Sequence, residues 1–493
     1  MPFENNNTNL NKLGQMSQHL PLSILCRWIA VSGSVLFFLH MFVFSVKHRG
    51  TLNLVVPSEL KFSSFSSSSP PFSPPETVEI PTDISHVVFV IVGSVTTWKH
   101  RRGYIESWWR PNITRGHVFL EQPPKRDLLP WPQTSPPFRI NKDPSAKPGN
   151  YTKLTSQTAI RLYQSLSDSF FNASDSVRWF VVADDDTLFF LDNLVEVLNK
   201  YDHKKHYYIG MNSENIWSNE VFSYDMGYGG GGYALSYLTV EALVGRMEEC
   251  IRRYPLMFSD LLSFLCLSDM GVDLTLEKGF HQIDLHGDIS GLLSAHPHSP
   301  PISLHHFDVI NPIFPTMSRQ ESVNNLMKTA KTDQTRLLQQ TICYRREINW
   351  SVSISWGYSV QIYETIIARS QLKRPLETFT PWRNVKPPFY RFNTRRVTKD
   401  PCEMPHLLFL DSTVEENNGE VSGTYRVKTA RRLPPCVSNG NHSALVVTQV
   451  RVAAPTLHKK DGRIECCDVR FANNKTDVLD VKIRDCMKDE ILA

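Results

Sequence analysis

The chain has 493 residues, a length that accommodates two or three domains, and it contains 41 % hydrophobic and 21 % charged residues. These fractions are ordinary for a globular protein. The formal net charge is only +4, so the composition gives no support to a nucleic-acid-binding protein.

A membrane anchor is predicted near the N-terminus. Residues 28–46 contain no Asp, Glu, Lys or Arg and have a strongly apolar centre, with Arg27 before them and Lys47 after them. About 20 apolar residues cross a bilayer as a helix, so this segment is long enough. Because no cleavage site follows, we expect an uncleaved anchor rather than a signal peptide. The flanking basic residues are similar on both sides and do not fix the orientation.

Cysteines and glycosylation patterns indicate on which side of the membrane the body lies. Eight of the nine cysteines follow the anchor: Cys250, Cys266, Cys343, Cys402, Cys436, Cys466, Cys467 and Cys486. Acceptor patterns for N-linked glycans also follow it, at Asn112, Asn150, Asn172, Asn349, Asn441 and Asn474. An even set of cysteines fits an oxidising lumen. We expect a cytosolic tail at residues 1–27, one span at 28–46 and a lumenal body; the alternative is a cytosolic body with reduced thiols.

A stem is predicted between the anchor and the folded body. Residues 62–75 are almost entirely Ser, Pro and Phe, and such a segment cannot bury enough apolar surface to fold. We therefore assign residues 47–85 to a stem that holds the body off the membrane.

The body is predicted to begin with an α/β domain at residues 86–335. The apolar run at residues 87–93 is typical of a strand buried on both faces. Further strands are expected at 117–120 and 177–183, and helical spacing of apolar residues appears between the strands, as in residues 98–109. Alternating strands and helices predict a doubly wound, mainly parallel sheet, which binds ligands beyond the carboxyl ends of its strands.

A second region is predicted over residues 336–493. Residues 350–356 alternate between apolar and polar, which indicates a strand with one exposed face. Five cysteines follow Pro401, together with short β-like runs such as residues 445–450. We interpret this region as a C-terminal extension braced by disulfides.

Three consecutive carboxylates, Asp184, Asp185 and Asp186, follow the strand at 177–183. Their mutual repulsion favours a bound cation, and carboxylates suit hard ions such as Mg²⁺ or Mn²⁺ that also bind substrate phosphates. The alternative is a turn or a helix N-cap. The phosphatase pattern Asp-x-Asp-x-Thr is excluded because Thr187 directly follows Asp186.

Two further segments offer ligand-binding groups. Four consecutive glycines, Gly229, Gly230, Gly231 and Gly232, lack a Cβ and would let backbone approach a ligand closely, although a flexible turn is the alternative. His305 and His306 lie in a histidine-rich stretch. A neutral imidazole can complete a manganese site, whereas a hydrogen-bonded structural role is the commoner fate of a histidine.

Taken together, these motifs resemble the fringe-related glycosyltransferases, similar to glycosyltransferase family 31, and more narrowly their plant branch, long classed as a domain of unknown function. The resemblance covers residues 86–382 and rests on the ordered motifs at 180–187, 227–236, 279–282, 295–297 and 303–306, with Cys250 between them. It implies a GT-A, nucleotide-diphospho-sugar transferase fold. It also implies a single-pass type II Golgi membrane protein that uses Mn²⁺ and a UDP-sugar, inverts the anomeric centre and usually forms a β-1,3 linkage.

The resemblance also implies roles for individual residues. The metal ligands would be Asp184, Asp186 and His306, with His305 as the fallback for the histidine. The nucleotide-sugar would be bound by Asp184 and Asp185 and by the glycines of residues 229–232.

The expected catalytic base is the position at which the chain departs from the family. Relatives carry Ser-Asp-Asp between the two cysteines, whereas this chain has Ser259-Asp260-Leu261. Asp260 is the candidate base, or else the base is the carboxylate that Leu261 replaces, in which case donor binding survives and transfer is lost. Cys250 and Cys266 flank this segment and are the best candidates for one disulfide, although eight cysteines permit 105 pairings.

The sequence therefore predicts a membrane-anchored inverting transferase that moves a hexose or N-acetylhexosamine from a UDP-sugar to an acceptor hydroxyl of a glycan, a glycoprotein or a small molecule. The alternative is a non-catalytic lumenal protein that keeps the fold and nucleotide binding. A lectin is a third possibility, but a lectin has no need of the acidic triplet.

Overall fold

The structure, a computed structural model, describes residues 80–142, 156–383, 385–416, 419–436, 443–456, 465–473 and 475–490. The predicted tail, the predicted anchor and most of the predicted stem lie outside these residues. Among the helices that the structure describes, none combines the length and the apolar composition needed to cross a bilayer.

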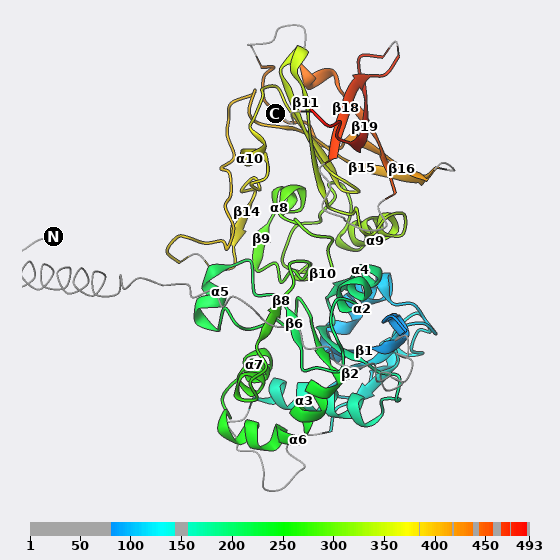
Figure 1. Cartoon of the computed structure of the whole chain (residues 1–493), viewed down its shortest axis with the longest axis vertical. Helices are drawn as coiled ribbons and strands as arrows, with labels where there is room; N and C mark the ends of the chain where they lie inside the picture. Colours follow the sequence, from blue (N-terminus) through cyan, green and yellow to red (C-terminus); the bar gives the residue numbers. More distant parts are fainter. Residues whose placement is uncertain are drawn as a thin grey trace, which may run out of the picture. The chain divides into compact units, whose positions relative to one another are not determined.

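The first sheet has seven strands, and the order of the strands is β3-β2-β1-β4-β7-β6-β8. Figure 1 labels β1, β2, β6 and β8 of this sheet. Its strands are β1 (Val87–Val92), β2 (Arg115–Leu120), β3 (Phe138–Ile140), β4 (Trp179–Asp184), β6 (Tyr208–Gly210), β7 (Tyr233–Ser236) and β8 (Leu274–Leu276). All neighbours pair in parallel except β7, which runs antiparallel to both β4 and β6. The sheet is therefore mainly parallel, as the sequence predicts.

Both faces of this sheet are buried, because successive residues of its central strands enter two different hydrophobic clusters. Phe89 and Val181 belong to one cluster and Val90 and Val182 to the other. Helices α2 (Val95–Trp108) and α4 (Leu191–Leu198) pack in the first cluster. Helices α3 (Gln157–Phe171), α6 (Tyr237–Arg253) and α7 (Ser259–Asp269) pack in the second. The expected doubly wound α/β layer arrangement follows from this alternation.

The second sheet has eight strands, in the order β11-β12-β13-β15-β16-β17-β19-β18. They are β11 (Gln340–Arg345), β12 (Trp350–Ser355), β13 (Ser359–Tyr363), β15 (His406–Glu415), β16 (Glu420–Val427), β17 (Gln449–Pro455), β18 (Glu465–Phe471) and β19 (Val478–Asp485). Its two edge strands meet, since the disulfide Cys343–Cys467 joins β11 to β18. Disulfides Cys402–Cys436 and Cys466–Cys486 brace the same region.

Two expectations for this region are wrong. Strand β12 is buried along its whole length, although one exposed face was expected. Its serines are accommodated inside because their hydroxyls find partners: Ser351 donates to Thr365 O and Ser355 donates to Leu293 O, both at 2.8 Å. The β-like run at residues 445–450 begins as a 3₁₀ turn (Ala444–Val446), and strand β17 starts only at Gln449.

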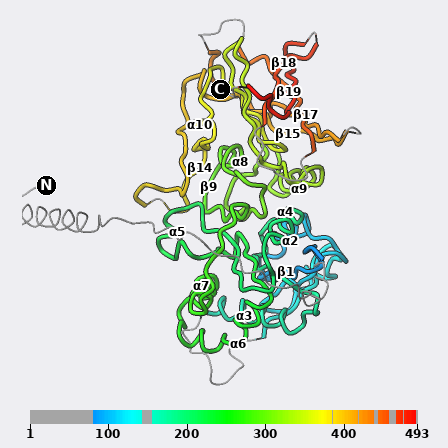
Figure 2. Tube along the Cα trace, viewed as in Figure 1, coloured from blue at the N-terminus to red at the C-terminus, as the bar shows by residue number. Residues whose placement is uncertain are grey.

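One short strand of the C-terminal region pairs with a strand of the N-terminal α/β region, and the two form a separate two-stranded sheet. Strand β14 (Phe379–Pro381) pairs antiparallel with β9 (Leu285–Gly287), and the two lie side by side in Figure 2. Tyr390 forms an isolated bridge with Asn215 a little further on. We call residues 376–395 the C-terminal strap. Side chains of both sheets also share the first hydrophobic cluster, so the predicted boundary at residues 335/336 does not divide the core.

Candidate functional site

Sheet topology places the acidic residues beside the glycine run. Strand β4 ends at Asp184, and β7 begins just after Gly232. Because β4 and β7 are antiparallel neighbours, with Val182 opposite Tyr233, the end of one strand lies at the start of the other. The hydroxyl of Thr187 also donates a hydrogen bond to the Gly230 carbonyl oxygen at 2.7 Å. The acidic residues and the glycine run therefore form one site at the carboxyl end of β4.

A second strand pair brings a histidine to the same place. Strand β10 (Ser303–Leu304) pairs antiparallel with β5 (Leu188–Phe189), with Leu304 opposite Leu188. His305 consequently lies next to the residues that precede Leu188. His305 Nε2 is 3.1 Å from Asp186 Oδ1 and 3.9 Å from Asp184 Oδ2.

These three side chains have the spacing of a metal site. One ligand atom from each of Asp184, Asp186 and His305 lies within 4.8 Å of the others. The Asp184 side chain is 47 % exposed, whereas that of Asp186 is 1 % exposed. Asp186 Oδ2 is buried and has no hydrogen-bond partner among the described residues. A buried carboxylate oxygen without a partner is costly, so the group fits a divalent cation.

The pKa values of Asp184, Asp186 and His305 are shifted because several charged groups lie close together. Although part of the Asp184 side chain reaches solvent, desolvation of its carboxyl group and the nearby carboxylates of Asp260, Asp186 and Asp185 raise its pKa to about 7 against the opposing charge of His305. Burial also opposes the charge of Asp186, but His305 outweighs it and the pKa of Asp186 is lowered to about 2. Burial disfavours a charged His305, yet the adjacent carboxylates raise its pKa to about 9. The site therefore favours positive charge beside Asp184 and Asp186.

Asp185 has a different role from its two neighbours. Its Oδ1 accepts a hydrogen bond from Arg101 Nη1 at 2.8 Å, and its Oδ2 accepts from Thr97 Oγ1 at 2.7 Å and from the Ser94 backbone at 3.2 Å. These donors are the N-cap of helix α2 and two residues of its first half. Asp185 was predicted to bind the nucleotide, but the structure directs both of its oxygens to the protein and uses them to fix α2 against the end of β4.

The glycine run faces the protein's own side chains. A Cβ on Gly229 would lie 2.5 Å from Asp260 Oδ1, and a Cβ on Gly230 would lie 2.2 Å from His305 Cε1. Gly231 donates its N–H to Gln282 Oε1 at 2.6 Å, and Gly232 has a φ of +82°, which favours glycine. The absent side chains thus allow the loop to approach Asp260 and His305. The glycine backbone does approach other groups closely, but these groups are the side chains of Asp260 and His305, whereas a ligand was expected.

Asp260, the candidate base, lies in the first turn of α7 beside this loop. Its Oδ2 accepts a hydrogen bond from the Gly229 N–H at 2.9 Å. Burial raises the pKa of Asp260 to about 6 against the effect of that hydrogen bond. Helix α7 is joined to α6 by the disulfide Cys250–Cys266, the pairing favoured from the sequence. Leu261 is half-buried on the same helix.

His306 lies outside the three-residue group. Its Nδ1 is 3.1 Å from Asp284 Oδ1, and its ring stacks on Trp382 with 4.6 Å between ring centroids and an interplanar angle of 8°. The opposite face of Trp382 stacks on His286. The geometry therefore favours the fallback, His305, as the metal-ligand position, and gives His306 a place in an aromatic stack behind it.

Several residues of the site carry no recognisable signal in the sequence. Arg101 joins Asp185, Asp186 and Asp308 with one guanidinium group, but its helix shows only an apolar pattern. Trp382 belongs to the C-terminal strap, about 200 residues from Asp184. Only the order of strands in space brings these residues together.

Other groups and hollows of the described residues do not fit this chemistry as well. Glu214, His281 and His296 also have ligand spacing, but the Glu214 carboxylate already accepts the Ile283 N–H at 2.8 Å and lies 2.8 Å from His281 Nδ1. Cys466 and Cys486 lie near Glu490, yet their sulfurs form a disulfide and offer no thiolate.

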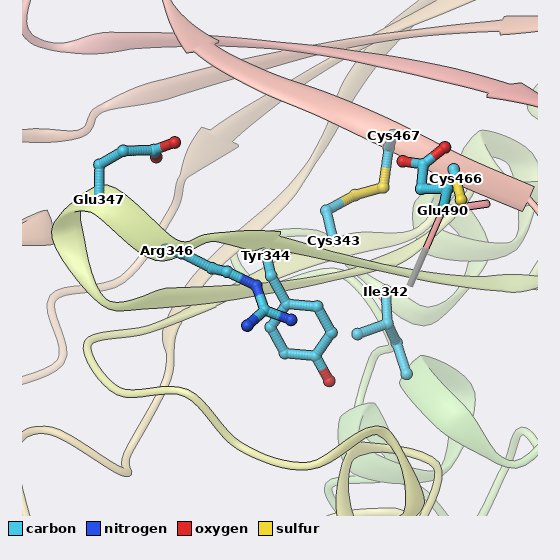
Figure 3. A pocket seen from close by; sticks show the side chains of 8 residues that line it. All are labelled: Ile342, Cys343, Tyr344, Arg346, Glu347, Cys466, Cys467 and Glu490. Atoms are coloured by element: carbon cyan, nitrogen blue, oxygen red, sulfur yellow. A yellow bond between two sulfur atoms is a disulfide. The ribbon is translucent and has the colours of Figure 1, made fainter. Parts of the chain in front are cut away.

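A hollow of about 160 Å³ lies at the junction of β11 and β18 (Figure 3). It is lined by Ile342, Cys343, Tyr344, Arg346, Glu347, Cys466, Cys467 and Glu490, and Figure 3 shows the Cys343–Cys467 disulfide beside it. None of the predicted site residues lines it.

Comparisons with known proteins agree with the motifs. A human protein called beta-1,3-glucosyltransferase is 29 % identical over 154 residues, which are 30 % of this chain and 28 % of that protein. The mouse protein of the same name is 29 % identical over 159 residues, 30 % of this chain and 29 % of that protein. The chain thus matches less than a third of the length of these relatives.

One solved structure, the catalytic domain of Drosophila beta1,4galactosyltransferase 7 in complex with xylobiose, aligns with 39 % of this chain and 64 % of its own. The identity is 12 % and the TM-score is 0.19, so this likeness carries no structural argument. The family model described as "Protein of unknown function, DUF604" matches residues 218–467, about half of the chain. The chain belongs to this family, the branch of the fringe-related glycosyltransferases that its motifs resemble.

Proposed function

We propose that the protein is a glycosyltransferase that moves a sugar from a UDP-sugar to an acceptor hydroxyl, depends on a divalent cation and inverts the anomeric centre. The observation that carries this proposal is the group of Asp184, Asp186 and His305, in which a buried carboxylate oxygen has no protein partner. The group lies next to a glycine loop and to a second carboxylate, Asp260.

The side chains of the site fit Mn²⁺. Asp184, Asp186 and His305 would hold the ion, since two carboxylates and one imidazole suit manganese. When bound, the ion would neutralise charge on the diphosphate of the leaving nucleotide. Asp185 would contribute indirectly by holding helix α2 in place through Arg101 and Thr97.

Asp260 would accept the proton of the acceptor hydroxyl as that oxygen attacks the sugar. The Gly229 N–H fixes the orientation of the Asp260 carboxylate by donating to Oδ2. Inversion needs one displacement and therefore no covalent intermediate on the protein. Asp260 lies at the glycine loop, where its carboxylate accepts the Gly229 N–H. This position supports Asp260 as an intact base, although Leu261 replaces the second carboxylate of the pair.

The names of the relatives suggest which donor and which linkage to test first. Because the two matched proteins are called beta-1,3-glucosyltransferases, UDP-glucose is the first donor to test and a β-1,3 bond is the first linkage to test. The proposal also places the protein in the Golgi membrane as a single-pass type II protein with a lumenal body. The four disulfides of the described residues support an oxidising compartment.

A donor panel tests the activity. Purified protein is incubated with Mn²⁺, each common UDP-sugar and a mixed acceptor extract, and the release of UDP is measured. We expect turnover with at least one donor, and its loss on chelation of the metal.

Two variants divide the roles. Asp186→Asn should lose metal-dependent UDP binding, whereas Asp260→Asn should bind UDP and fail to transfer. Asp192→Asn, which alters an exposed acid that pairs with Arg110, is the control and should behave as wild type. UDP binding without turnover in the unmodified protein would favour the non-catalytic alternative. Glycan binding without Mn²⁺ or UDP would favour a lectin.

A further inference from the structure

We propose that residues 369–399, which include the C-terminal strap, form a docking surface for an acidic polysaccharide, a chain of sugars that carries carboxylate groups. We call these residues the basic segment. The inference goes beyond the proposed function, because transfer to a hydroxyl requires neither negative charge on the acceptor nor a second surface that holds it. Docking can be measured without a donor sugar and is therefore tested separately from the transferase activity.

The basic segment concentrates positive charge in a chain that is close to neutral. It contains nine basic residues and one acidic residue, Glu377, and so has a formal net charge of +8, whereas the whole chain has a net charge of +4. The basic residues are Arg369, Lys373, Arg374, Arg383, Lys386, Arg391, Arg395, Arg396 and Lys399. The rest of the chain is therefore slightly acidic on balance, and the positive charge is a local feature of this segment.

The basic side chains of the segment have no acidic partners. None of the nine forms an ion pair with a described residue, whereas basic residues elsewhere on the surface do, as Arg451 does with Asp480. Six of the nine are exposed: Lys373, Arg374, Arg383, Lys386, Arg396 and Lys399. Their charge is thus available to a partner from outside the chain.

Two of the half-buried arginines hold the segment in place through neutral oxygens. Arg391 Nε donates to Ser213 O at 3.1 Å, and Arg395 Nη2 donates to the Tyr363 hydroxyl at 2.6 Å. Arg395 Nε also donates to Arg374 O at 3.1 Å. These bonds anchor the segment without neutralising either guanidinium group.

Two adjoining hollows lie along the basic segment. The larger, of about 660 Å³, is lined by Arg391 and Arg396, and the smaller, of about 330 Å³, is lined by Arg395 and Arg396. Because Arg396 lines both, the hollows meet at this residue. Each hollow also has one acidic residue, Glu377 in the larger and Glu403 in the smaller. Basic residues outnumber acidic ones in both, so the hollows favour an anionic ligand.

Aromatic rings in the larger hollow favour a sugar chain over an acidic peptide. Phe389, Tyr390 and Phe392 line it, and the rings of Tyr390 and Phe392 stack with 5.7 Å between their centroids. The C–H face of a sugar ring complements the negative face of an aromatic ring. The planar guanidinium group of arginine binds a carboxylate through two parallel hydrogen bonds. An acidic sugar presents a rigid apolar face and a carboxylate together, whereas an acidic side chain of a peptide presents only the carboxylate.

The basic segment also passes close to the candidate metal group. Trp382, which directly precedes Arg383, stacks on His306, and the His306 ring lies 3.9 Å from that of His305. Figure 1 labels two elements of the segment, α10 (Arg369–Leu372) and β14. A polymer that docks on the segment is thereby kept near the site at which we propose transfer.

The test measures binding of an oligogalacturonate to the purified full chain by titration calorimetry, without a UDP-sugar. We expect the affinity to fall at least tenfold between about 50 and about 200 mM NaCl, because salt screens exposed charges. The fully methyl-esterified oligomer has the same sugar backbone without the charge and should bind at least tenfold more weakly. Polyglutamate of equal charge is the peptide probe and should also bind at least tenfold more weakly.

Variants locate the binding on the segment. Arg396→Glu reverses an exposed charge where the two hollows meet and should weaken binding of the oligogalacturonate at least tenfold, whereas Arg396→Lys keeps the charge and should recover most of the affinity. Arg246→Glu makes the same change at an exposed residue of α6, outside the segment, and is the matched control. It should bind as wild type does, and all three variants should keep the thermal stability of the wild type.

Equal affinities in wild type and Arg396→Glu would overturn the docking surface, and so would equal affinities for the charged and the esterified oligomer. Equal or tighter binding of polyglutamate would overturn a polysaccharide as the partner. A protein that releases UDP but does not bind the oligogalacturonate would keep the proposed function and lose this inference. A protein that binds the oligogalacturonate and releases no UDP from any donor would do the reverse.

Discussion

Adjacent residues of this site have different roles, and the contacts of the backbone decide which. Asp184 and Asp186 lie with His305, whereas Asp185 between them holds helix α2. The sequence could identify the acidic cluster because it follows a strand directly. It could not choose between His305 and His306, since the two are neighbours in the chain and only the register of β10 on β5 decides which ring reaches Asp186.

The close approach of Gly230 to His305 leads to a first prediction. In Gly230→Ala the new Cβ would start 2.2 Å from the buried His305 ring, which must then move. We expect the affinity for Mn²⁺ with UDP, measured by titration calorimetry, to fall at least tenfold. Gly245→Ala is the matched control, because a Cβ at that position of α6 meets nothing within 4 Å. It should keep the affinity and stabilise the helix by up to about 1 kcal/mol. Equal affinities in Gly230→Ala and Gly245→Ala would contradict the assignment of His305 as a metal ligand.

His117 on β2 predicts a dependence of stability on pH. Burial, with the positive charge of Arg139, lowers the pKa of His117 to about 4 in the folded protein, against about 6.5 in an unfolded chain. The unfolded state therefore takes up a proton first as the pH falls. The contribution of neutral His117 to the free energy of unfolding is complete above about pH 6.5 and is lost as the pH falls towards about 4.

Since His117 is partly exposed, solvent screening limits the loss to about 1 to 2 kcal/mol. Urea unfolding at pH 7 and at pH 5 should show a smaller loss in His117→Asn than in wild type. His206→Asn changes an exposed histidine and should lose as much stability as wild type does. The same loss in His117→Asn as in wild type would refute the role of burial.

At the scale of elements, local patterns predicted the strands and helices of the first sheet but not the contribution of the C-terminal strap. The apolar runs of β1 and β4 and the helical spacing in α2 depend on neighbours in the chain, so they are readable one segment at a time. Strand β14 has three residues and no pattern, and its pairing with β9 depends on the fold. The alternation in β12 suggested one face in water, but the whole strand is buried, and the hydroxyls of Ser351 and Ser355 donate to backbone carbonyl oxygens.

Trp382 gives the strap a role that can be tested. Its ring lies between those of His286 and His306, and the His306 ring lies 3.9 Å from that of His305. We expect Trp382→Ala to weaken Mn²⁺-dependent UDP binding by about tenfold, as loss of a residue that supports a metal ligand commonly does. Trp382→Phe should recover most of the affinity.

Val385→Ala is the control for the strap, because Val385 is 51 % exposed and lies three residues further along. It should leave the affinity unchanged. If Trp382→Ala keeps wild-type affinity and thermal stability, the stack has no influence on the ligand position, and the strap serves only the fold.

At the scale of the whole molecule, the two sheets form one folding unit. The predicted boundary at residues 335/336 coincides with the start of the second sheet, since β11 begins at Gln340. The first hydrophobic cluster nevertheless contains side chains of both sheets, such as Phe89 and Ile354. A change in sequence pattern marks a change in the type of secondary structure, but it does not show whether the parts share a core.

Truncation tests this view. A chain of residues 80–335 would expose the apolar side chains of the first cluster that normally pack against residues 337–483, and we expect it to be insoluble or unfolded by circular dichroism. A chain of residues 80–493 should be soluble and should unfold in one calorimetric transition, because buried contacts link the sheets. The strap adds to this coupling, since Arg391 donates its N–H to Glu214 O at 3.0 Å. Two separate transitions, or a stable 80–335 fragment that binds UDP with Mn²⁺, would show that the transferase core folds without the C-terminal region.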